Sequence, residues 1–324
     1  MLNLRQVKHL ARILDTTQRD LEETLDDGTR CYEHLVLRDP AKPHKEREVL
    51  SVKGPVRTLQ SRIYRRLLLP KLAPSIFSHG GVRGRHIKTN VEAHRRSAFV
   101  FKTDIADFYP TIHYSRVYRL FVHDLGCSPD VARLCTRLCT FRHHLALGLI
   151  TSPILADLAL RRVDSRIGAA CRRAGLVFTR YVDDITISGP FDLSRSGFEA
   201  VVLRILSEDG FQANCSKSQF GELSKSIAIT NIRILRGHLD VRREYADELD
   251  RLLENSRRLA NGGKTDGPYL TQTQIRGRLQ FVCWVNPGRR RQLMRKYRSI
   301  CWRRVARAAL EQGLVAMKKT LHRA

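Results

Sequence analysis

Two adjacent acids, Asp183 and Asp184, lie where the sequence otherwise predicts an ordinary β-hairpin. They separate two apolar segments, 176–182 and 185–187, whose β-branched and aromatic residues are typical of buried strands. Two-residue hairpin turns favour Asn-Gly, Asp-Gly or Gly-Gly, because the backbone there needs positive φ angles. Two neighbouring carboxylates at a hairpin tip repel each other, and they do not favour the positive φ angles of the turn. The pair therefore indicates a hairpin tip that is kept for chemistry, since strained positions persist where function requires them.

A third acid, Asp104, ends another predicted strand, the segment 98–104. That strand can lie beside the hairpin in one sheet, with helices between them in the chain. Three carboxylates at adjacent strand ends make an oxygen-rich site for hard divalent cations. Two Mg²⁺ ions there, or Mn²⁺ as a substitute, could activate a 3′-hydroxyl and stabilise leaving pyrophosphate. The alternative for Asp104 alone is a capped or salt-bridged acid.

The charge of the chain points to a polyanionic partner. It carries 58 Lys and Arg against 32 Asp and Glu, a net charge of +26. Such a field attracts nucleic acid most simply, and a membrane surface is the lesser option. Between Arg289 and Arg323 the only acid is Glu311, and Tyr297 and Trp302 interleave with the cations. This pattern suits phosphate contacts and base stacking, and a solvated helix face is the alternative.

The sequence also predicts a cytoplasmic protein without a membrane partner. Its first residues do not resemble a signal peptide. The longest apolar stretch, 145–160, contains Pro153 and Asp157 and is too short to span a bilayer. The eight cysteines include no CxxC pair, so we expect free thiols.

Several motifs occur in the order found in one family. The YVDD sequence at 181–184 resembles the YxDD box of reverse transcriptases, and Asp104 followed by Phe108 and Tyr109 resembles their first palm motif. NVEAH at 90–94 is similar to the NAxxH signature of retron enzymes. Further similarities are the fingers entry at 52–69, the fingers loop SHGGVRGRHI at 78–87, GLITSP at 148–153, the motif D lysine at Lys217 and the thumb start QFVCWVNP at 280–287. Together they resemble a retron-type bacterial reverse transcriptase over nearly the whole chain.

Three positions depart from that family. ALG at 146–148 stands where PQG is usual, Asp157 stands where Asn is usual, and LRG at 235–237 stands where retron enzymes have VTG. These changes predict a divergent branch that handles its template differently, with the catalytic acids intact.

The resemblance implies an α+β right-hand polymerase fold. Residues 1–97 would form the fingers with a helical N-terminal segment. Residues 98–240 would form the palm, a four-stranded antiparallel sheet with two helices that carries the Asp triad. Residues 241–324 would form a helical, basic thumb. The polar stretch 261–268 predicts a linker within the thumb.

The resemblance also assigns catalytic and nucleotide-binding roles. Asp104 and Asp183 would ligate both metals, with Asp184 an accessory ligand and the Ile105 carbonyl completing the shell. Tyr109 would exclude a ribose 2′-hydroxyl. Arg85, or Arg83 as second choice, would bind the triphosphate. Gly148 would lie under the template base. Lys217 would donate a proton to pyrophosphate, and a solvated lysine is the alternative.

The expected RNA contacts lie in two regions. Asn90 and His94 would pin the fingers–palm junction or touch RNA. The thumb would clamp duplex RNA through its backbone, with salt-dependent affinity. The thumb residues concerned are Arg289, Arg290, Arg291, Arg295, Lys296, Arg298 and Trp302.

The function implied is that of a retron enzyme, an RNA-directed DNA polymerase that uses dNTPs. It would bind its structured noncoding RNA, prime from a guanosine 2′-hydroxyl and make multicopy single-stranded DNA joined to RNA. An effector protein would act with it in antiphage defence. The alternatives are another defence-associated or group II intron-like reverse transcriptase, and an RNA-binding scaffold with a decayed site. An RNA-dependent RNA polymerase is disfavoured by Tyr109.

Overall fold

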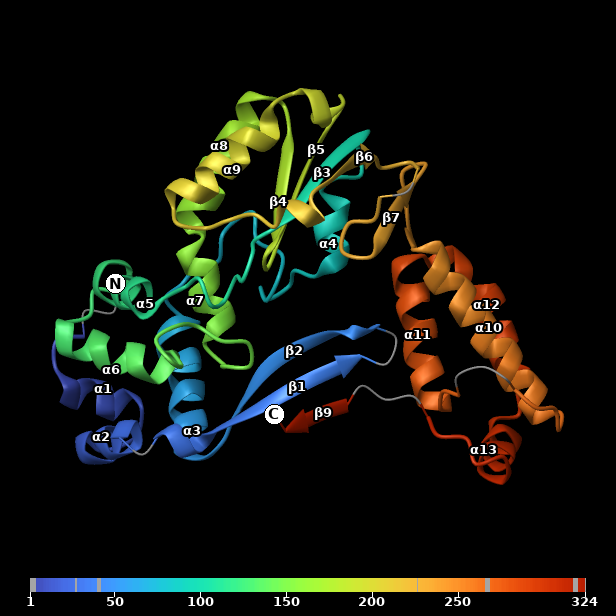
Figure 1. Ribbon diagram of the computed structural model, residues 1–324, viewed down its shortest axis with the longest axis horizontal. Helices are drawn as coiled ribbons and strands as arrows, with labels where there is room; N and C mark the ends of the chain where they lie inside the picture. Colours follow the sequence, from blue (N-terminus) through green and yellow to red (C-terminus); the bar gives the residue numbers. More distant parts are fainter. Residues whose placement is uncertain are drawn as a thin grey trace.

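The computed structural model describes residues 4–26, 28–39, 42–225, 227–265, 269–316 and 320–323. Three parts form an arch: an N-terminal part at one foot, a β-sheet at the top and C-terminal helices at the other foot (Figure 1). These are the fingers, palm and thumb of a right-hand polymerase fold, as predicted. Within the described ranges, no helix has the length and apolar character needed to cross a membrane.

The fingers combine short helices with a long β-hairpin. The predicted N-terminal helical segment is two helices. A third helix widens into a π-helical turn after Arg62. The elements are α1 (Val7–Ile13), α2 (Gln18–Asp26), β1 (Tyr32–Asp39), β2 (Lys42–Val52), α3 (Gly54–Arg62) and the π turn Ile63–Leu68.

The palm is built on a four-stranded antiparallel sheet, which confirms the prediction. Its strand order is β4-β5-β3-β6. The strands are β3 (Phe99–Asp104), β4 (Val177–Tyr181), β5 (Asp184–Gly189) and β6 (Gln219–Glu222). Helices α8 (Arg161–Arg173) and α9 (Phe198–Glu208) pack on one face of this sheet, with the buried side chains of Ile185 and Ile187 in the shared core.

Fingers and palm share one hydrophobic core, so they form a continuous body. Residues as distant in sequence as Leu10, Phe121 and Ile185 belong to it. The helices that connect the two parts are α4 (Ile87–Glu92), α5 (Tyr114–Arg119) with the π turn Leu120–Asp124, α6 (Pro129–Cys139) and α7 (Ser152–Ala159).

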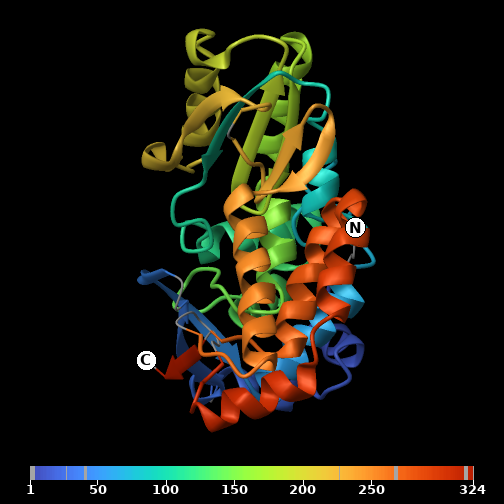
Figure 2. The same cartoon turned by 90° about the vertical axis from the view of Figure 1, so that its right-hand side faces the viewer.

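The thumb is built around a second core, which also includes Val91 of α4 and Val100 of β3. It is made by α10 (Arg243–Ala260), α11 (Gln272–Val285), α12 (Arg290–Arg298) and α13 (Trp302–Glu311). The hairpin of β7 (Ile232–Leu235) and β8 (His238–Val241) packs into the same core, so this core begins before the predicted boundary. Figure 2 shows the thumb helices running down from that hairpin. The predicted linker falls between α10 and α11, and its residues 266–268 lie outside the described residues.

The expectation of a wholly helical thumb region is wrong at its end. Residues Thr320–Arg323 form β9, which pairs antiparallel with β1 of the fingers. The free edge of β1 presents unpaired backbone groups that an extended segment can satisfy. The chain therefore returns from the thumb to the fingers sheet.

Candidate active site

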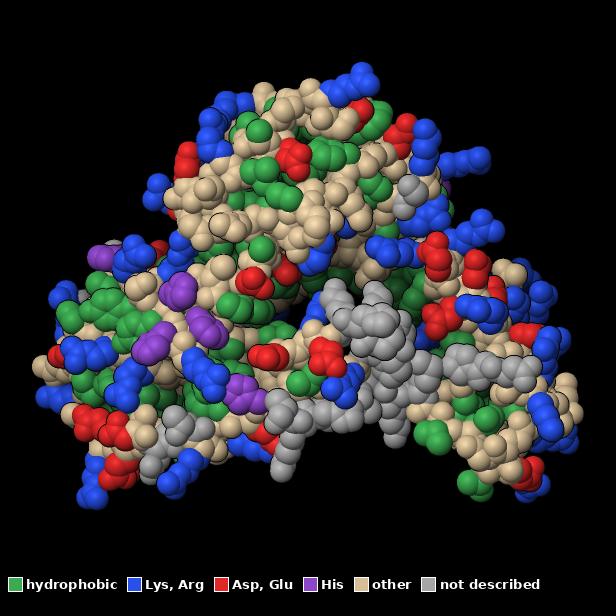
Figure 3. Space-filling model, viewed as in Figure 1, with side chains coloured by type: hydrophobic (Ala, Val, Ile, Leu, Met, Phe, Trp, Pro, Cys, Tyr) green, Lys and Arg blue, Asp and Glu red, His purple; other side chains and the backbone are tan. Residues whose placement is uncertain are grey.

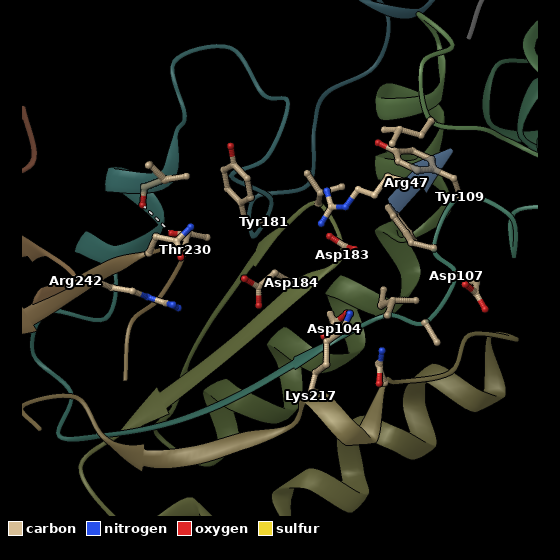
Figure 4. A pocket seen from close by; sticks show the side chains of 18 of the residues that line it. Arg47, Asp104, Asp107, Tyr109, Tyr181, Asp183, Asp184, Lys217, Thr230 and Arg242 are labelled. Atoms are coloured by element: carbon tan, nitrogen blue, oxygen red, sulfur yellow. Dashed lines mark hydrogen bonds and ion pairs between the residues drawn. The ribbon is translucent and has the colours of Figure 1, made fainter. Parts of the chain in front are cut away.

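A cleft of about 1380 Å³ lies among fingers, palm and thumb. The three predicted acids line it, together with Arg47 from β2 and Tyr245 and Phe281 from the thumb. Figure 4 shows the acids between two cations, with Arg47 reaching toward Asp183 and Lys217 toward Asp104.

The hairpin that carries the acids has a strained tip. Tyr181 pairs with Asp184 across the strands, so the two turn residues are Val182 and Asp183. The expectation that Asp183 and Asp184 share the tip is therefore corrected by one residue, because Asp184 already begins β5. Val182 has φ of 62°, a left-handed conformation that β-branched residues rarely adopt. Glycine is the favoured residue at the first central position of a type II′ hairpin turn, where φ is positive. The strain of a valine there persists only where surrounding contacts impose it.

Arg180, which precedes the motif, supplies those contacts. The residue is 1% exposed, and its side chain donates to both carboxylate oxygens of Asp164, at 2.8 and 2.7 Å. It also donates to Asp157 at 2.8 Å and to the carbonyl of Val182 at 2.7 Å. A buried guanidinium is stable only when paired in this manner. Asp157, the departure from the usual Asn, is therefore an ion-pair partner of the residue that fixes the turn.

The fingers loop at 78–80 lies directly against the same turn. The backbone N–H of His79 donates to the carbonyl of Arg180 at 2.7 Å. A Cβ added at Gly80 would lie 2.6 Å from the backbone nitrogen of Val182 and 2.5 Å from its side chain. Only glycine allows this approach. The loop and the Arg180 cluster thus hold the hairpin from two sides.

The three acids lie close together at the strand ends. Asp104 and Asp184 are directly opposed in the β3–β5 ladder, and the N–H of Ile105 donates to the carbonyl of Asp183 at 3.0 Å. Burial raises the pKa of Asp183, and the charge of Asp104 raises it further. Burial also raises the pKa of Asp184, although Lys102 opposes the change. The site thus concentrates negative charge in a poorly solvated place.

The donor set fits hard divalent cations, although the side chains are not gathered into a cage. Among the residues that the structure describes, no group of three His, Cys, Asp or Glu side chains forms a ready metal cluster. Lys217 instead holds Asp104, with its Nζ 2.5 Å from Oδ2. No described backbone N–H donates to the Ile105 carbonyl, which leaves that oxygen available as a ligand. Carboxylate and carbonyl oxygens are the ligands that such cations prefer.

The cation that faces the acids from the fingers differs from the predicted ones. Neither Arg83 nor Arg85 lines the cleft. Arg85 donates to the carbonyls of Ser75 and Ser78 at 2.7 and 2.5 Å, so it braces the fingers loop. Arg47, whose positive charge opposes the raised pKa of Asp183, occupies the place that we expected for Arg85. No local sequence pattern identifies Arg47, because its approach to the acids depends on where the β1–β2 hairpin lies.

Tyr109 and Gly148 lie near the acids in different ways. Tyr109 lines the cleft, and burial followed by the charge of Asp183 raises the pKa of its phenol. Gly148 does not line the cleft. It has φ of 107°, and an added Cβ would lie 2.0 Å from the carbonyl oxygen of Leu50 in β2. Gly148 therefore allows strand β2 of the fingers hairpin to pack closely against this segment, while its neighbour Leu147 lines the cleft.

Asn90 and His94 are both fully buried, which fits the junction role and leaves neither exposed to RNA. His94 bonds the hydroxyls of Ser188 and Thr179 at 2.6 and 2.7 Å, across β5 and β4. Burial lowers its pKa to about 3, so the ring is neutral. Neither side-chain polar atom of Asn90 has a partner among the described residues.

The predicted thumb cations lie outside the cleft lining. Arg289 pairs with Asp240 and Lys296 with Asp250, both at 2.6 Å. Trp302 donates to the carbonyl of Tyr297 at 3.2 Å, so it packs within the thumb. Four cations are exposed and make no ion pair among the described residues, and these are Arg290, Arg291, Arg295 and Arg298.

A four-stranded antiparallel palm sheet that presents three acids to a cleft between fingers and thumb defines the class of right-hand nucleic-acid polymerases. The family model described as "Reverse transcriptase (RNA-dependent DNA polymerase)" matches residues 43–247. The chain is 28% identical over 285 residues to the retron Mx65 reverse transcriptase of Myxococcus xanthus, covering 82% of this chain and 65% of that protein. It is 27% identical over 249 residues to the retron Ec86 reverse transcriptase of Escherichia coli, covering 77% and 76%.

The chain therefore belongs to the reverse transcriptase family and is of the retron type, as the motifs predicted. It spans 65% of the length of the Mx65 relative and 58% of the length of the retron Ec48 reverse transcriptase of Escherichia coli, to which it is 30% identical. Reverse transcriptases use divalent metal ions, in keeping with the oxygen donors at the strand ends.

Proposed function

We propose that this protein extends a primer with dNTPs on an RNA template, with chemistry at Asp104, Asp183 and Asp184. The observation that carries the proposal is the placing of these acids, on adjacent strand ends and on a hairpin tip that Arg180 holds in a strained conformation. A site that had decayed into a scaffold would have no need of that strain. The intact acids thus favour an enzyme over the scaffold alternative.

Asp104, Asp183 and the Ile105 carbonyl would hold two divalent ions, Mg²⁺ with Mn²⁺ as a substitute, and Asp184 would be an accessory ligand. When bound, such ions activate the primer hydroxyl and stabilise the leaving pyrophosphate. Mutual repulsion among the three carboxylates, together with their burial, makes a site that gains from cations.

The protein's own cations would act on the triphosphate. Arg47 faces Asp183 across the cleft and would bind the phosphates by charge-assisted hydrogen bonds, in the role first assigned to Arg85. Lys217 is within hydrogen-bond reach of Asp104 and would donate a proton to the pyrophosphate. Tyr109 would close the space where a ribose 2′-hydroxyl would lie, and so select dNTPs.

The partners would be those of a retron. The protein would bind a structured noncoding RNA, prime from a guanosine 2′-hydroxyl and make single-stranded DNA joined to RNA, with an effector protein in antiphage defence. The named relatives are retron enzymes, and the NVEAH segment lies at the junction with the palm sheet. The exposed arginines of α12 would contact RNA phosphates, so RNA affinity should fall with rising salt.

The test is to purify the protein from its native host and analyse its nucleic acid on denaturing gels after RNase or DNase treatment. Asp183→Asn is the matched control, because it removes the charge and keeps the shape. A discrete RNA-linked DNA in wild type alone would support the proposal. RNA without DNA in both samples would favour the scaffold, and untethered DNA would favour another reverse transcriptase system.

A further inference from the structure

A second hollow, of about 530 Å³, opens on the fingers. None of its lining residues lines the catalytic cleft. Its walls come from α2, β1, α3, α5, α6 and the segment 140–143. A hollow of this size with aromatic walls and a few polar groups is typical of a site for a small ligand.

The hollow contains an aromatic cluster centred on Phe141. Its ring centroid lies 4.8 Å from that of Tyr32 and 5.3 Å from that of His34. The guanidinium of Arg142 lies 5.4 Å from the Phe141 ring centroid, within cation–π range. Flat rings beside an arginine are the means by which proteins hold single nucleobases.

The turn that carries Arg142 and His143 is strained. Phe141 and His144 exchange both backbone hydrogen bonds, at 2.9 and 3.1 Å, so Arg142 and His143 are the two turn residues. Their φ angles are 45° and 67°. Positive φ at both positions is the pattern of a type I′ turn, for which Asn-Gly is strongly preferred. The chain thus keeps two large cationic or titratable side chains where its backbone disfavours them, as it keeps Val182 in the catalytic hairpin.

The charge of the hollow suits an anion. Arg137 and Arg142 line it, and no acidic side chain does so among the described residues. Asp26 pairs with Arg137 at 3.2 Å from outside the lining, whereas Arg142 makes no ion pair in the described part of the chain. Figure 3 shows histidine and basic side chains gathered over the fingers face that carries α5 and α6.

We propose that this hollow binds one unpaired nucleotide of RNA, with its base against the aromatic cluster and its phosphate near Arg142 and Arg137. The segment that carries the turn runs on to Leu147, which lines the catalytic cleft, so one RNA strand crossing the fingers can reach both sites. The proposal rests on the proposed function, because it takes the nucleic acid that crosses the fingers to be the RNA on which the protein acts.

The first test is photocrosslinking of the full chain to a short single-stranded RNA that contains thiouridine, followed by peptide mapping. We expect crosslinks to peptides with Tyr32 or Phe141, besides crosslinks in the cleft. The double variant Arg142→Asn/His143→Gly should lose the former and keep the latter. Its melting temperature should be unchanged or higher, because Asn-Gly suits the turn. Arg195→Asn, an exposed arginine replaced in the palm, should retain both sets.

The outcomes separate the two proposals. Cleft crosslinks without hollow crosslinks, or hollow crosslinks that persist in the double variant, would overturn the second site. No cleft crosslinks would instead count against the proposed function. Loss of the hollow crosslink on adding uridine monophosphate at a concentration equal to that of the RNA would overturn the RNA assignment, because the ligand would then be a free nucleotide.

A second variant tests the stacking contact. Phe141→Leu keeps an apolar side chain against Tyr32 and removes the aromatic face. Because stacking on one aromatic ring contributes on the scale of a fivefold or greater change in affinity, we expect the dissociation constant for the same RNA, measured by anisotropy, to rise about fivefold. An unchanged constant would refute the stacking assignment.

Discussion

Replacing Gly148 by alanine should displace the fingers hairpin from Asp104, Asp183 and Asp184. Alanine at φ of 107° would be strained, and its Cβ would lie 2.0 Å from the carbonyl oxygen of Leu50. Since such contacts are essentially never shorter than 3.0 Å, the two segments would have to separate by about 1 Å. The hydrogen bond from the N–H of Leu50 to the carbonyl of Leu147, now 2.8 Å, would stretch beyond useful length.

The cost in stability can be estimated from these two losses. Backbone strain of about 1–3 kcal/mol and a lost hydrogen bond of about 0.5–1.5 kcal/mol together predict about 1.5–4.5 kcal/mol of destabilisation. The kinetic effect should be larger than the stability suggests, because Arg47 lies in the same strand as Leu50 and would retreat from Asp183. A displacement of this size can cost about a hundredfold in the rate of the chemical step. Because the withdrawn Arg47 would also bind the triphosphate less well, we expect the KM for dNTP to rise about tenfold or more.

The assay is steady-state primer extension on a generic RNA template, with a thermal melt of each protein. Gly175→Ala is the matched control, because Gly175 has φ of 67° and no atom within 4 Å of an added Cβ. The control should lower the melting temperature and leave the KM for dNTP unchanged. An equal KM in Gly148→Ala and Gly175→Ala would refute the idea that Gly148 seats the hairpin.

Three further changes follow from the site. Arg47→Ala should raise the KM for dNTP about tenfold in primer extension with little change in RNA affinity; an unchanged KM would remove Arg47 from the triphosphate site. Arg180→Met should cost about 3–5 kcal/mol in denaturant unfolding by leaving two carboxylates buried and unpaired, whereas a loss under 1 kcal/mol would argue against the cluster. His94 has its pKa lowered to about 3 by burial. Between about pH 6.5 and 3 the unfolded chain therefore binds a proton that the folded chain does not. The free energy of unfolding should fall by about 1.4 kcal/mol for each pH unit as pH drops from about 6.5 toward 3. His94→Gln should flatten that slope in unfolding curves.

The positions of the three acids in the fold could be predicted from the sequence because their signals are local. A strand pattern next to an acid identifies Asp104, and the conflict between a hairpin pattern and two carboxylates identifies Asp183 and Asp184. The four-stranded antiparallel palm sheet is implied by the family resemblance, and three of its strands also have a local strand pattern. These features depend on a few neighbouring residues, whose patterning is kept in the folded protein.

Features that depend on distant segments could not be predicted. Arg47 and Arg85 are both basic residues of the fingers, and only the path of the β1–β2 hairpin decides which one faces the acids. Gly148 lies in a motif that the resemblance places under the template base, yet in the structure it packs against the backbone of Leu50. Strand β9 pairs with β1 across almost the full length of the chain. The buried partners of Arg180 could have been suspected, because an arginine in an apolar strand requires acids nearby.

Val182 allows a direct test of whether strain in the hairpin that carries Asp183 serves activity. Val182→Gly would relieve about 1–2 kcal/mol of left-handed strain, and it would lose a similar amount through chain entropy and lost packing against Gly80. We therefore expect a melting temperature close to wild type. Primer extension should nevertheless fall, because glycine gives the backbone before Asp183 more conformational freedom, even though its carbonyl can still accept from Arg180. Val182→Asn is the control, since Asn tolerates positive φ and keeps a side chain. Full activity in Val182→Gly would show that the strained turn is incidental and that the acids need only their strand ends.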